Sequence, residues 1–307
     1  MSEVAVREIQ GREHWTTSGG ERLFMWEKPA AGDGPKKGTL LFVHGSSMAS
    51  QPTFDLKVPG RPNSSAMDWF AAQGFDTWCF DARGYGRSGK PQGFDATIAD
   101  GAEDIGAVSE YIVANGGEER LHLYGISSGA LKAALFAERH PDRVARLALD
   151  AYVWTGEGSH TLAERRKKLP NFASGTRRPI DRAFVHSIFN RDHPGTADEQ
   201  VVDAFADAIL SLDDSMPNGT YIDMCSRLPV NDPTAIQVPT IVMRGEYDGI
   251  ASLPDLLSFF EKLPNSDKQF AIMPGISHAS FQQKNYMLVY HILLSFLTQP
   301  GPVYRGA

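Results

Sequence analysis

The sequence predicts an α/β fold in which a mostly parallel central sheet has helices on both faces and carries an inserted helical cap. Two observations support this prediction. Short apolar segments bounded by Gly, Asp or Pro alternate with helical patterns, and continuous apolar strands are typical of buried parallel sheets. The alternation stops between residues 150 and 238, where helix-like stretches occur without a convincing strand. We therefore expect a core domain from residues 1–150 and 238–307, with residues 151–237 as the cap.

Each expected element follows from a local pattern. Six apolar segments are expected to form the parallel strands, at residues 39–43, 76–80, 121–124, 144–149, 239–243 and 269–273. Two earlier segments are expected to add an antiparallel edge, at residues 4–10 and 22–28. Helices are expected in the core at residues 65–73, 98–114, 128–139, 253–263 and 283–297, and in the cap at residues 179–188 and 197–212. Strands and helices in this order form an open sheet with helices on both faces.

Composition disfavours several classes of protein. The 307 residues include 30 Lys and Arg and 37 Asp and Glu, a formal net charge of -7. Nucleic-acid binding needs clustered cations against the phosphates, so this balance disfavours it. The longest apolar run, residues 287–297, is about half of the roughly 20 residues that span a membrane. With no signal peptide visible, we expect a cytoplasmic protein that acts on a small molecule, and the oligomeric state stays open.

The most specific motif is a glycine-flanked serine turn, Gly125-Ile126-Ser127-Ser128-Gly129, between a predicted strand and an Ala-rich helix. A serine in such a turn has a strained backbone, and the flanking glycines let strand and helix approach. Its hydroxyl would point into the crevice where ligands bind in parallel sheets. The first N–H groups of the helix would favour developing negative charge there. The motif therefore predicts that Ser127 is a nucleophile.

Together with two further motifs, this turn resembles the α/β-hydrolase superfamily. His44-Gly45-Ser46-Ser47 is similar to the family's oxyanion loop, and residues 81–88, DARGYGRS, are similar to its D-x-R-G-x-G-x-S turn. The resemblance extends from about residue 20 to residue 298, except for the cap, and implies the α/β-hydrolase fold. Because the turn carries serine where dehalogenases and epoxide hydrolases of this fold carry aspartate, those two chemistries are disfavoured.

The resemblance also implies a catalytic triad in the chain order nucleophile, acid, histidine. Asp248 follows the predicted strand at residues 239–243 and matches the position of the acid. Glu246 and Asp150 remain alternative carboxylates. His278, in the loop after the last predicted strand, is the candidate base.

The oxyanion hole is expected to use backbone N–H groups. The resemblance assigns one donor to Ser46, which follows the His-Gly pair, and the other to Ser128, which follows the nucleophile. Ser47 is a rival for the first donor, because it stands where the family often has proline.

Substrate contacts are less well defined. Trp154 is a candidate substrate-binding residue because it follows a strand end. Five large cap residues have two possible roles: they line an apolar pocket or pack the cap itself. They are Phe172, Phe184, Phe189, Tyr221 and Met224. The cap also contains a group of basic residues with two possible roles. They form a solvated face, or they bind a substrate carboxylate through bidentate hydrogen bonds. They are Arg165, Arg166, Lys167, Lys168, Arg177, Arg178 and Arg182.

The sequence thus predicts a serine hydrolase that cleaves a small ester, thioester, lactone or amide through an acyl-enzyme on Ser127. One alternative keeps the triad but hydrolyses a carbon–carbon bond of a dienoic or β-diketone substrate. Another is a non-catalytic small-ligand receptor on the same scaffold. The spacing of His, Cys, Asp and Glu suggests no metal site, and no cofactor is expected.

Overall fold

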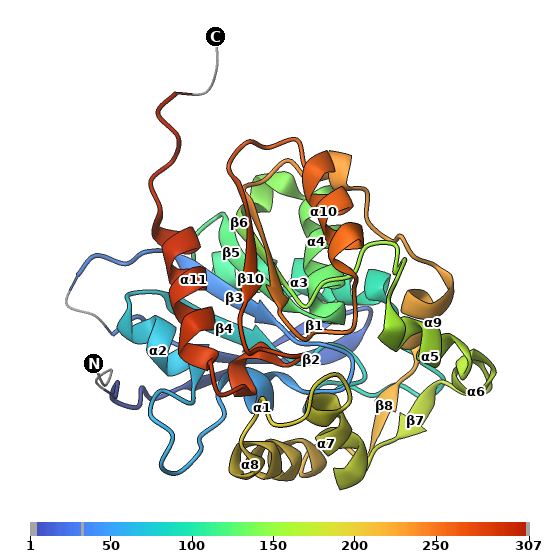
Figure 1. Cartoon of the computed structure of the whole chain (residues 1–307). Coiled ribbons are helices and arrows are strands. Elements are labelled where there is room, and N and C mark those ends of the chain that lie inside the picture. The colour runs from blue at the N-terminus through green and yellow to red at the C-terminus, as the bar shows by residue number, and fades with distance from the viewer. Residues whose placement is uncertain (1–4, 32–33, 305–307) are drawn as a thin grey trace.

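A single mixed sheet organises the molecule. The computed structural model describes residues 5–31 and 34–304. The sheet strands are β1 (Arg12–Ser18), β2 (Glu21–Lys28), β3 (Thr39–Val43), β4 (Asp76–Phe80), β5 (Leu121–Ile126), β6 (Val144–Asp150), β9 (Thr240–Gly245) and β10 (Lys268–Met273). Their order across the sheet is β1-β2-β4-β3-β5-β6-β9-β10 (Figure 1). β2 pairs antiparallel with β1 and β4, and the remaining neighbours are parallel.

The six parallel strands lie where the apolar segments predict them. The antiparallel edge differs: β2 matches the segment at residues 22–28, but its partner is Arg12–Ser18, and residues 5–10 form no strand. Val4 lies outside the described residues. The backbone N–H groups of Val6 and Ile9 donate to the side chains of Asn63 and Asp68 instead of to a strand. The prediction of a strand at residues 4–10 is therefore wrong, because long-range side-chain acceptors hold this segment.

Helices pack on both faces of the sheet, as predicted. α2 and α11 lie together on one face, where the Trp69 and Tyr290 rings are 5.1 Å apart, and α3 and α4 pack against the other (Figure 1). Polar caps define several helix starts: the hydroxyls of Ser65 and Ser252 each accept a backbone N–H of the first turn. The core helices are α1 (Ser50–Phe54), α2 (Ala66–Ala72), α3 (Ile98–Ala114), α4 (Ser128–Arg139), α10 (Leu253–Lys262) and α11 (Tyr286–Thr298).

Stacked aromatic rings support the carboxyl ends of the central strands. The rings of Phe42 on β3 and Phe54 on α1 are 5.0 Å apart, and those of Tyr124 on β5 and Phe281 are 4.8 Å apart. All four side chains are buried. Aromatic pairs at these separations contribute about 0.5–1.5 kcal/mol each beyond their area burial. The cluster therefore holds the ends of β3 and β5 against the loop that follows β10.

The segment between β6 and β9 adds no strand to the main sheet. It contains the elements α5 (His160–Arg166), α6 (Leu169–Ala173), β7 (Arg177–Pro179), α7 (Arg182–Asn190), α8 (Glu199–Leu210), β8 (Ser215–Pro217) and α9 (Gly219–Ser226). β7 and β8 pair antiparallel, so the expectation of a region without strands is wrong. Each strand has three residues, one of them proline, which is too short for the sequence to show an alternating pattern.

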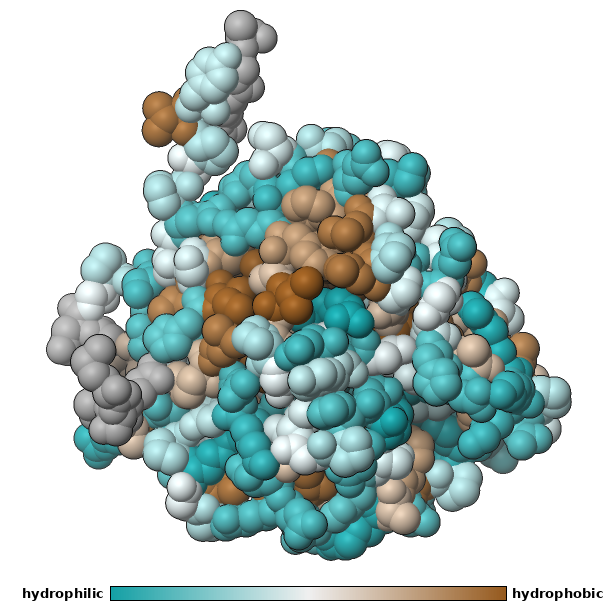
Figure 2. All heavy atoms as spheres, viewed as in Figure 1, coloured by the Kyte–Doolittle hydropathy of each residue, from teal (hydrophilic) through white to brown (hydrophobic). Residues whose placement is uncertain are grey.

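Figure 2 shows an apolar area on the surface where β10 lies between α10 and α11. Leu257 of α10 and Ile272 of β10 are 45% and 48% exposed. β10 is the last strand of the sheet, so this area lies beside its free edge. Among the described residues, no helix combines the length and apolarity that crossing a membrane requires.

Candidate active site

Ser127 occupies the sharp turn between β5 and α4. Its φ of 57° is rare for a residue with a side chain, and such backbone strain costs on the order of 1–3 kcal/mol. A Cβ on Gly125 would lie 2.4 Å from the carbonyl oxygen of Gly129, and one on Gly129 would lie 2.2 Å from that of Val43. Only glycine fits at either position, so both flanking glycines of the predicted motif are required by close backbone approach.

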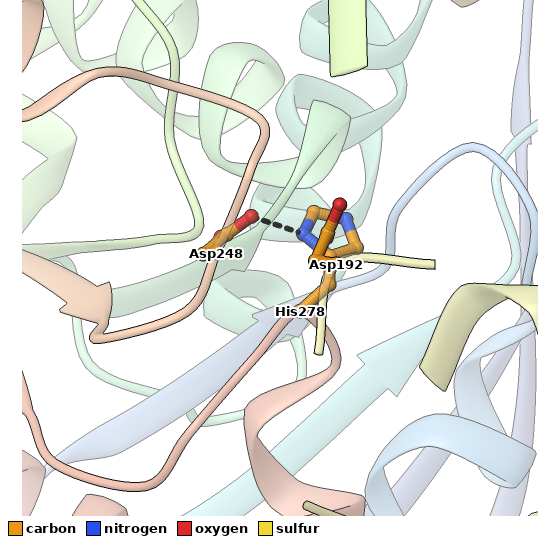
Figure 3. A group of neighbouring side chains, drawn as sticks. All are labelled: Asp192, Asp248 and His278. Carbon is orange, nitrogen blue, oxygen red and sulfur yellow. Dashed lines mark hydrogen bonds and ion pairs between the residues drawn. The ribbon is translucent and has the colours of Figure 1, made fainter. Parts of the chain in front are cut away.

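His278 and Asp248 complete a hydrogen-bonded chain with Ser127. His278 Nε2 lies 3.1 Å from Ser127 Oγ. On the other side of the ring, Nδ1 lies 3.0 Å from Asp248 Oδ1, the contact drawn as a dashed line in Figure 3. Burial by itself raises the pKa of Asp248, but contact with His278 and the N–H of Ile250 hold that pKa below its usual value. The carboxylate is therefore ionised and accepts the Nδ1 proton, which leaves Nε2 to accept the Ser127 hydroxyl proton.

Neither alternative carboxylate has a hydrogen bond or ion pair with His278. Glu246 accepts the backbone N–H of Gly275 at 2.8 Å, which ties together the loops after β9 and β10. Asp150 is fully buried at the end of β6 and accepts the hydroxyl of Tyr124. Burial raises the pKa of Asp150 to about 7. Of the three candidate acids, Asp248 alone has its carboxylate on the imidazole.

The loop after β3 lies beside the serine. Ser46 and Ser47 line the same small space as Ser127 and His278, and Ser128 is fully buried as the first residue of α4. His44 lies behind this loop: Nε2 accepts the N–H of Ala82 at 3.0 Å, and Nδ1 donates to the carbonyl of Gly45 at 2.8 Å. Burial, with a contribution from the Lys132 charge, lowers the pKa of His44 to about 3. His44 is thus a neutral hydrogen-bonding link, separate from the triad.

The turn at residues 81–88 supports the same loop from below. Asp81 accepts hydrogen bonds from the backbone N–H and hydroxyl of Ser50 and from the N–H of Arg87. A Cβ on Gly86, where φ is +52°, would lie 2.2 Å from the Asp81 carboxylate. These contacts explain the spacing of the motif. Residues 86 and 87 fold back onto the Asp81 carboxylate, and the same carboxylate fixes the start of α1.

Residues from the segment between β6 and β9 border the space above Ser127. Arg165, Ile188, Arg191 and Tyr221 line it together with Ser127, and its volume is about 10 Å³, room for about one water molecule. A second cavity of about 250 Å³ lies beside it and shares Arg165 and Arg191 as lining residues. The motifs did not identify Ile188 or Arg191, because cap contacts carry no local signature. For Arg165 the sequence left open a solvated face or a carboxylate contact. For Tyr221 it left open pocket lining or packing within the cap.

Trp154 lies elsewhere, contrary to the expectation that it contacts the substrate. It is absent from the residues around Ser127 and lines a separate cavity with Ser252 and Asp255. The Asp255 carboxylate accepts the backbone N–H groups of Trp154 and Thr155, both at 3.1 Å. These bonds tie the chain after β6 to the start of α10 and direct Trp154 away from the serine. Its position near a strand end was therefore a misleading signal.

Asp192, which follows α7, is a second carboxylate near the imidazole that the motifs missed. Asp192, Asp248 and His278 each place one possible metal-ligand atom within 4.8 Å of the others (Figure 3). Both ring nitrogens of His278 are already engaged, by Asp248 and Ser127. Asp192 itself accepts the hydroxyl of Thr161 at 3.0 Å and faces Arg191 at 3.4 Å. The donor set therefore matches a Ser-His-Asp triad with a neighbouring cap carboxylate better than a metal centre.

A mostly parallel sheet, a strained serine turn and this hydrogen-bonded chain define an α/β-hydrolase. The family model described as "Serine aminopeptidase, S33" matches residues 34–285, and the chain belongs to that family. The match includes Ser127, Asp248 and His278 and all of residues 151–237.

Proteins similar to this chain include a relative by sequence and solved structures with the same fold. The chain is 23% identical over 303 residues to "Uncharacterized protein YnbC" of Escherichia coli K12, covering 95% of this chain and 47% of that protein; it thus spans about half the length of this relative. A soluble variant of monoglyceride lipase from Saccharomyces cerevisiae, in complex with a substrate analogue, superposes with a TM-score of 0.68 at 18% identity and 97% coverage of both chains. E-2-(acetamidomethylene)succinate hydrolase gives 0.66 at 19% identity, covering 94% of this chain and 100% of that one.

Proposed function

We propose that the protein is a serine hydrolase that cleaves a small ester, thioester, lactone or amide through an acyl-enzyme on Ser127. The observation that carries this proposal is the continuous chain from Ser127 Oγ through both nitrogens of His278 to the Asp248 carboxylate, at 3.1 and 3.0 Å. A base within hydrogen-bond distance of the nucleophile, itself oriented by a carboxylate, is the arrangement that nucleophilic catalysis needs.

Each residue has a defined role in the proposed reaction. Ser127 Oγ attacks the carbonyl carbon while its proton passes to His278 Nε2, and Asp248 stabilises the imidazolium that forms. The proton then moves to the leaving group as the bond to that group breaks. Water, activated by His278, attacks the acyl-enzyme and releases the acid, which regenerates Ser127.

The oxyanion of the tetrahedral intermediate would be stabilised by the backbone N–H groups of Ser128 and Ser46, with Ser47 as the rival of Ser46. Support comes from the position of the loop after β3 against the space above Ser127 and from the helix that begins at Ser128. Removing one donor of this kind costs about 2.7–4 kcal/mol of transition-state stabilisation. Because the donors belong to the backbone, replacing the serine side chains would test them poorly.

Residues 151–237 would act as a cap that opens to admit substrate. Arg165, Ile188 and Tyr221 from this segment enclose Ser127, which is 6% exposed, and a space of about 10 Å³ is too small for any ester. Closure after binding would exclude water from the site. The proposal keeps a small-molecule substrate and a cytoplasmic location.

The experiment that tests the proposal is intact-protein mass spectrometry after exposure to a fluorophosphonate, which reacts with activated serines. We expect one adduct on the wild type and none on Ser127→Ala. If the wild type and Ser127→Ala are modified equally, Ser127 is not the nucleophile. If neither is modified, even at long exposure, the protein is better described as a ligand receptor on this scaffold.

Hydrolysis of a carbon–carbon bond with the same triad is the second candidate, and the arginines beside Ser127 favour it because such substrates can carry a carboxylate. Product analysis separates the two. Hydrolysis of a dienoic or β-diketone substrate would yield a carboxylic acid and a second product that carries a new C–H bond. Hydrolysis of an ester would yield an acid and an alcohol.

A further inference from the structure

Three arginines of the cap surround one tyrosine beside the catalytic serine. The guanidinium carbons of Arg165 and Arg178 lie 4.5 and 3.7 Å from the centre of the Tyr221 ring. Arg191 lines the space above Ser127 together with Arg165 and Tyr221. The Tyr221 hydroxyl lies 3.1 Å from Ser47 Oγ. Positive charge is thus concentrated beside the space above Ser127.

The three arginines differ in how they are bonded. Arg178 donates to the carbonyl and hydroxyl oxygens of Ser46 and Ser47, both at 3.0 Å, and so links cap and core. Arg191 faces the Asp192 carboxylate at 3.4 Å. Arg165 has neither a hydrogen bond from its guanidinium nor an ion pair with any described residue, and its Nη1 is buried without a partner. A buried donor without a partner is unfavourable, and more so when it belongs to a charged group, so Arg165 needs an explanation.

The neighbouring acids do not neutralise Arg165. Glu164, the preceding residue on α5, pairs with Lys167, and Asp192 accepts from Thr161 as well as facing Arg191. Although burial raises the pKa of Tyr221, the charges of Arg165, Arg178 and Arg191 lower it to about 7. The charge of the three arginines therefore outweighs the effect of burial on Tyr221.

Arg165 and Arg191 also lie between two cavities. They line both the space above Ser127 and the outer cavity of about 250 Å³. An extended molecule that occupies both spaces would place one part at Ser127 and pass its remainder between the two guanidinium groups. A guanidinium offers a planar fork of N–H donors that pairs with a carboxylate through two hydrogen bonds.

From this placement we infer that the substrate carries a carboxylate a few bonds away from the scissile carbonyl, and that Arg165, with Arg191, binds it. The inference rests on the proposed function because it names the substrate class of the same site. Carboxylate binding explains why the residue at this position is charged. Packing on Tyr221 does not explain it, since a methionine would pack equally well without a buried charge.

The test compares two esters of equal chain length, 4-nitrophenyl hydrogen adipate and 4-nitrophenyl hexanoate, which differ in the terminal carboxylate. We expect the wild type to prefer the adipate in kcat/KM. Arg165→Met should lower kcat/KM for the adipate by roughly 10- to 100-fold, as loss of a charge-assisted contact does, and reduce hexanoate turnover far less. Lys167→Met, which removes a charge from the exposed side of the same region, is the matched control and should leave the preference intact. Arg165→Lys, which keeps the charge but loses the fork, should fall between.

A second readout needs no turnover. Succinate, glutarate, adipate and inorganic phosphate are titrated into the wild type, Arg165→Met and Lys167→Met by calorimetry. A bound carboxylate adds negative charge beside Tyr221 and so raises the pKa of that phenol, which reduces its phenolate absorbance near neutral pH. We expect a dicarboxylate to bind the wild type and Lys167→Met and to bind Arg165→Met at least tenfold more weakly.

The outcomes separate this inference from the proposed function. If the fluorophosphonate modifies Ser127 but no dicarboxylate binds, or if Arg165→Met slows both esters equally, the carboxylate inference is wrong and the hydrolase proposal stands. If inorganic phosphate binds more tightly than every dicarboxylate, the anion is a phosphate and the carboxylate assignment is wrong. Dicarboxylate binding that depends on Arg165, without fluorophosphonate modification, would support the anion site and contradict the hydrolase proposal.

Discussion

The core side and the cap side of the site hold their charges in different ways. On the core side, Asp248 is held by His278 and the N–H of Ile250, and neutral His44 links two loops. On the cap side, Arg165 presents a buried nitrogen without a partner. A group that is already bonded is positioned before any ligand arrives, while one without a partner is ready to receive it. On this difference rests our proposal that the core supplies the chemistry and the cap supplies the selectivity.

The largest expected effect is on the core side. Ser127→Ala and His278→Ala should each lower kcat by about four to six orders of magnitude, because the triad acts as a unit. Hydrolysis of 4-nitrophenyl esters checks this, with circular dichroism to show that each variant folds. The control is His186→Ala, which should stay active. It removes a histidine of the cap that pairs with Asp203. Substantial activity in His278→Ala would break the assignment of catalysis to the core.

The next effect separates the two carboxylates near His278. Asp248→Asn should lower kcat about 10⁴-fold, because it removes the acceptor that orients the imidazole and stabilises its charged form. Asp192→Asn, on the cap side, should reduce kcat by about tenfold at most, since Asp192 bonds Thr161 and Arg191 and does not hold the imidazole through a hydrogen bond. Steady-state kinetics on both variants decides between them. The reverse order would make Asp192 the acid.

A buried core carboxylate should also make stability depend on pH. The pKa of Asp150 is raised from 3.8 to about 7 by burial, so between these values the folded protein binds more protons than the unfolded chain. The contribution is therefore fully present below about pH 4 and is lost as pH rises towards 7, with a magnitude on the order of 4 kcal/mol. Chemical denaturation of the wild type and Asp150→Asn at pH 5 and pH 8 tests this.

In that comparison, Asp150→Asn should flatten the loss of stability between the two pH values. It should leave esterase activity within a few-fold of wild type, because the Asp150 carboxylate bonds Tyr124 and not His278. An unchanged pH dependence in Asp150→Asn would show that another group causes it. A collapse of activity would restore Asp150 as a candidate acid.

The smallest effect is spectroscopic and belongs to the cap. A phenol should titrate with a pKa of about 7 in the wild type, because the arginines outweigh burial at Tyr221. Tyr221→Phe should lack this titration, and Arg165→Met should shift it to higher pH, since losing a cation disfavours the phenolate. Near-ultraviolet absorbance during a pH titration checks both. A titration that persists unchanged in Tyr221→Phe would remove Tyr221 from the account.

The sequence predicted the core far better than the cap, for a physical reason. Ser127 and its glycines were recognisable because a positive φ and a close backbone approach restrict the allowed residues within a few positions. The parallel strands were recognisable because continuous apolar runs are buried on both faces. Asp248 and His278 followed from chain order, once the resemblance to α/β-hydrolases was established.

The cap residues depend on contacts between distant segments. Arg165 meets Tyr221 across 56 positions, and no local spacing distinguishes that arginine from Arg166 or Lys167, which turn elsewhere. The same limit explains Trp154. Its position after a strand suggested a place in the site, but its backbone N–H donates to Asp255 and its side chain lies elsewhere. Asp192 had no motif at all. Side chains that act through tertiary contacts need the fold before they can be assigned.

The most direct test of the central claim is to trap the acyl-enzyme. The wild type is mixed with 4-nitrophenyl hexanoate, quenched in acid within its first turnovers and measured by intact-protein mass, with peptide mapping. The account predicts a burst of nitrophenolate and a mass increase of one acyl group located on Ser127, both absent in Ser127→Ala. Steady hydrolysis by the wild type with no burst, no acylated peptide and equal rates in Ser127→Ala would contradict it.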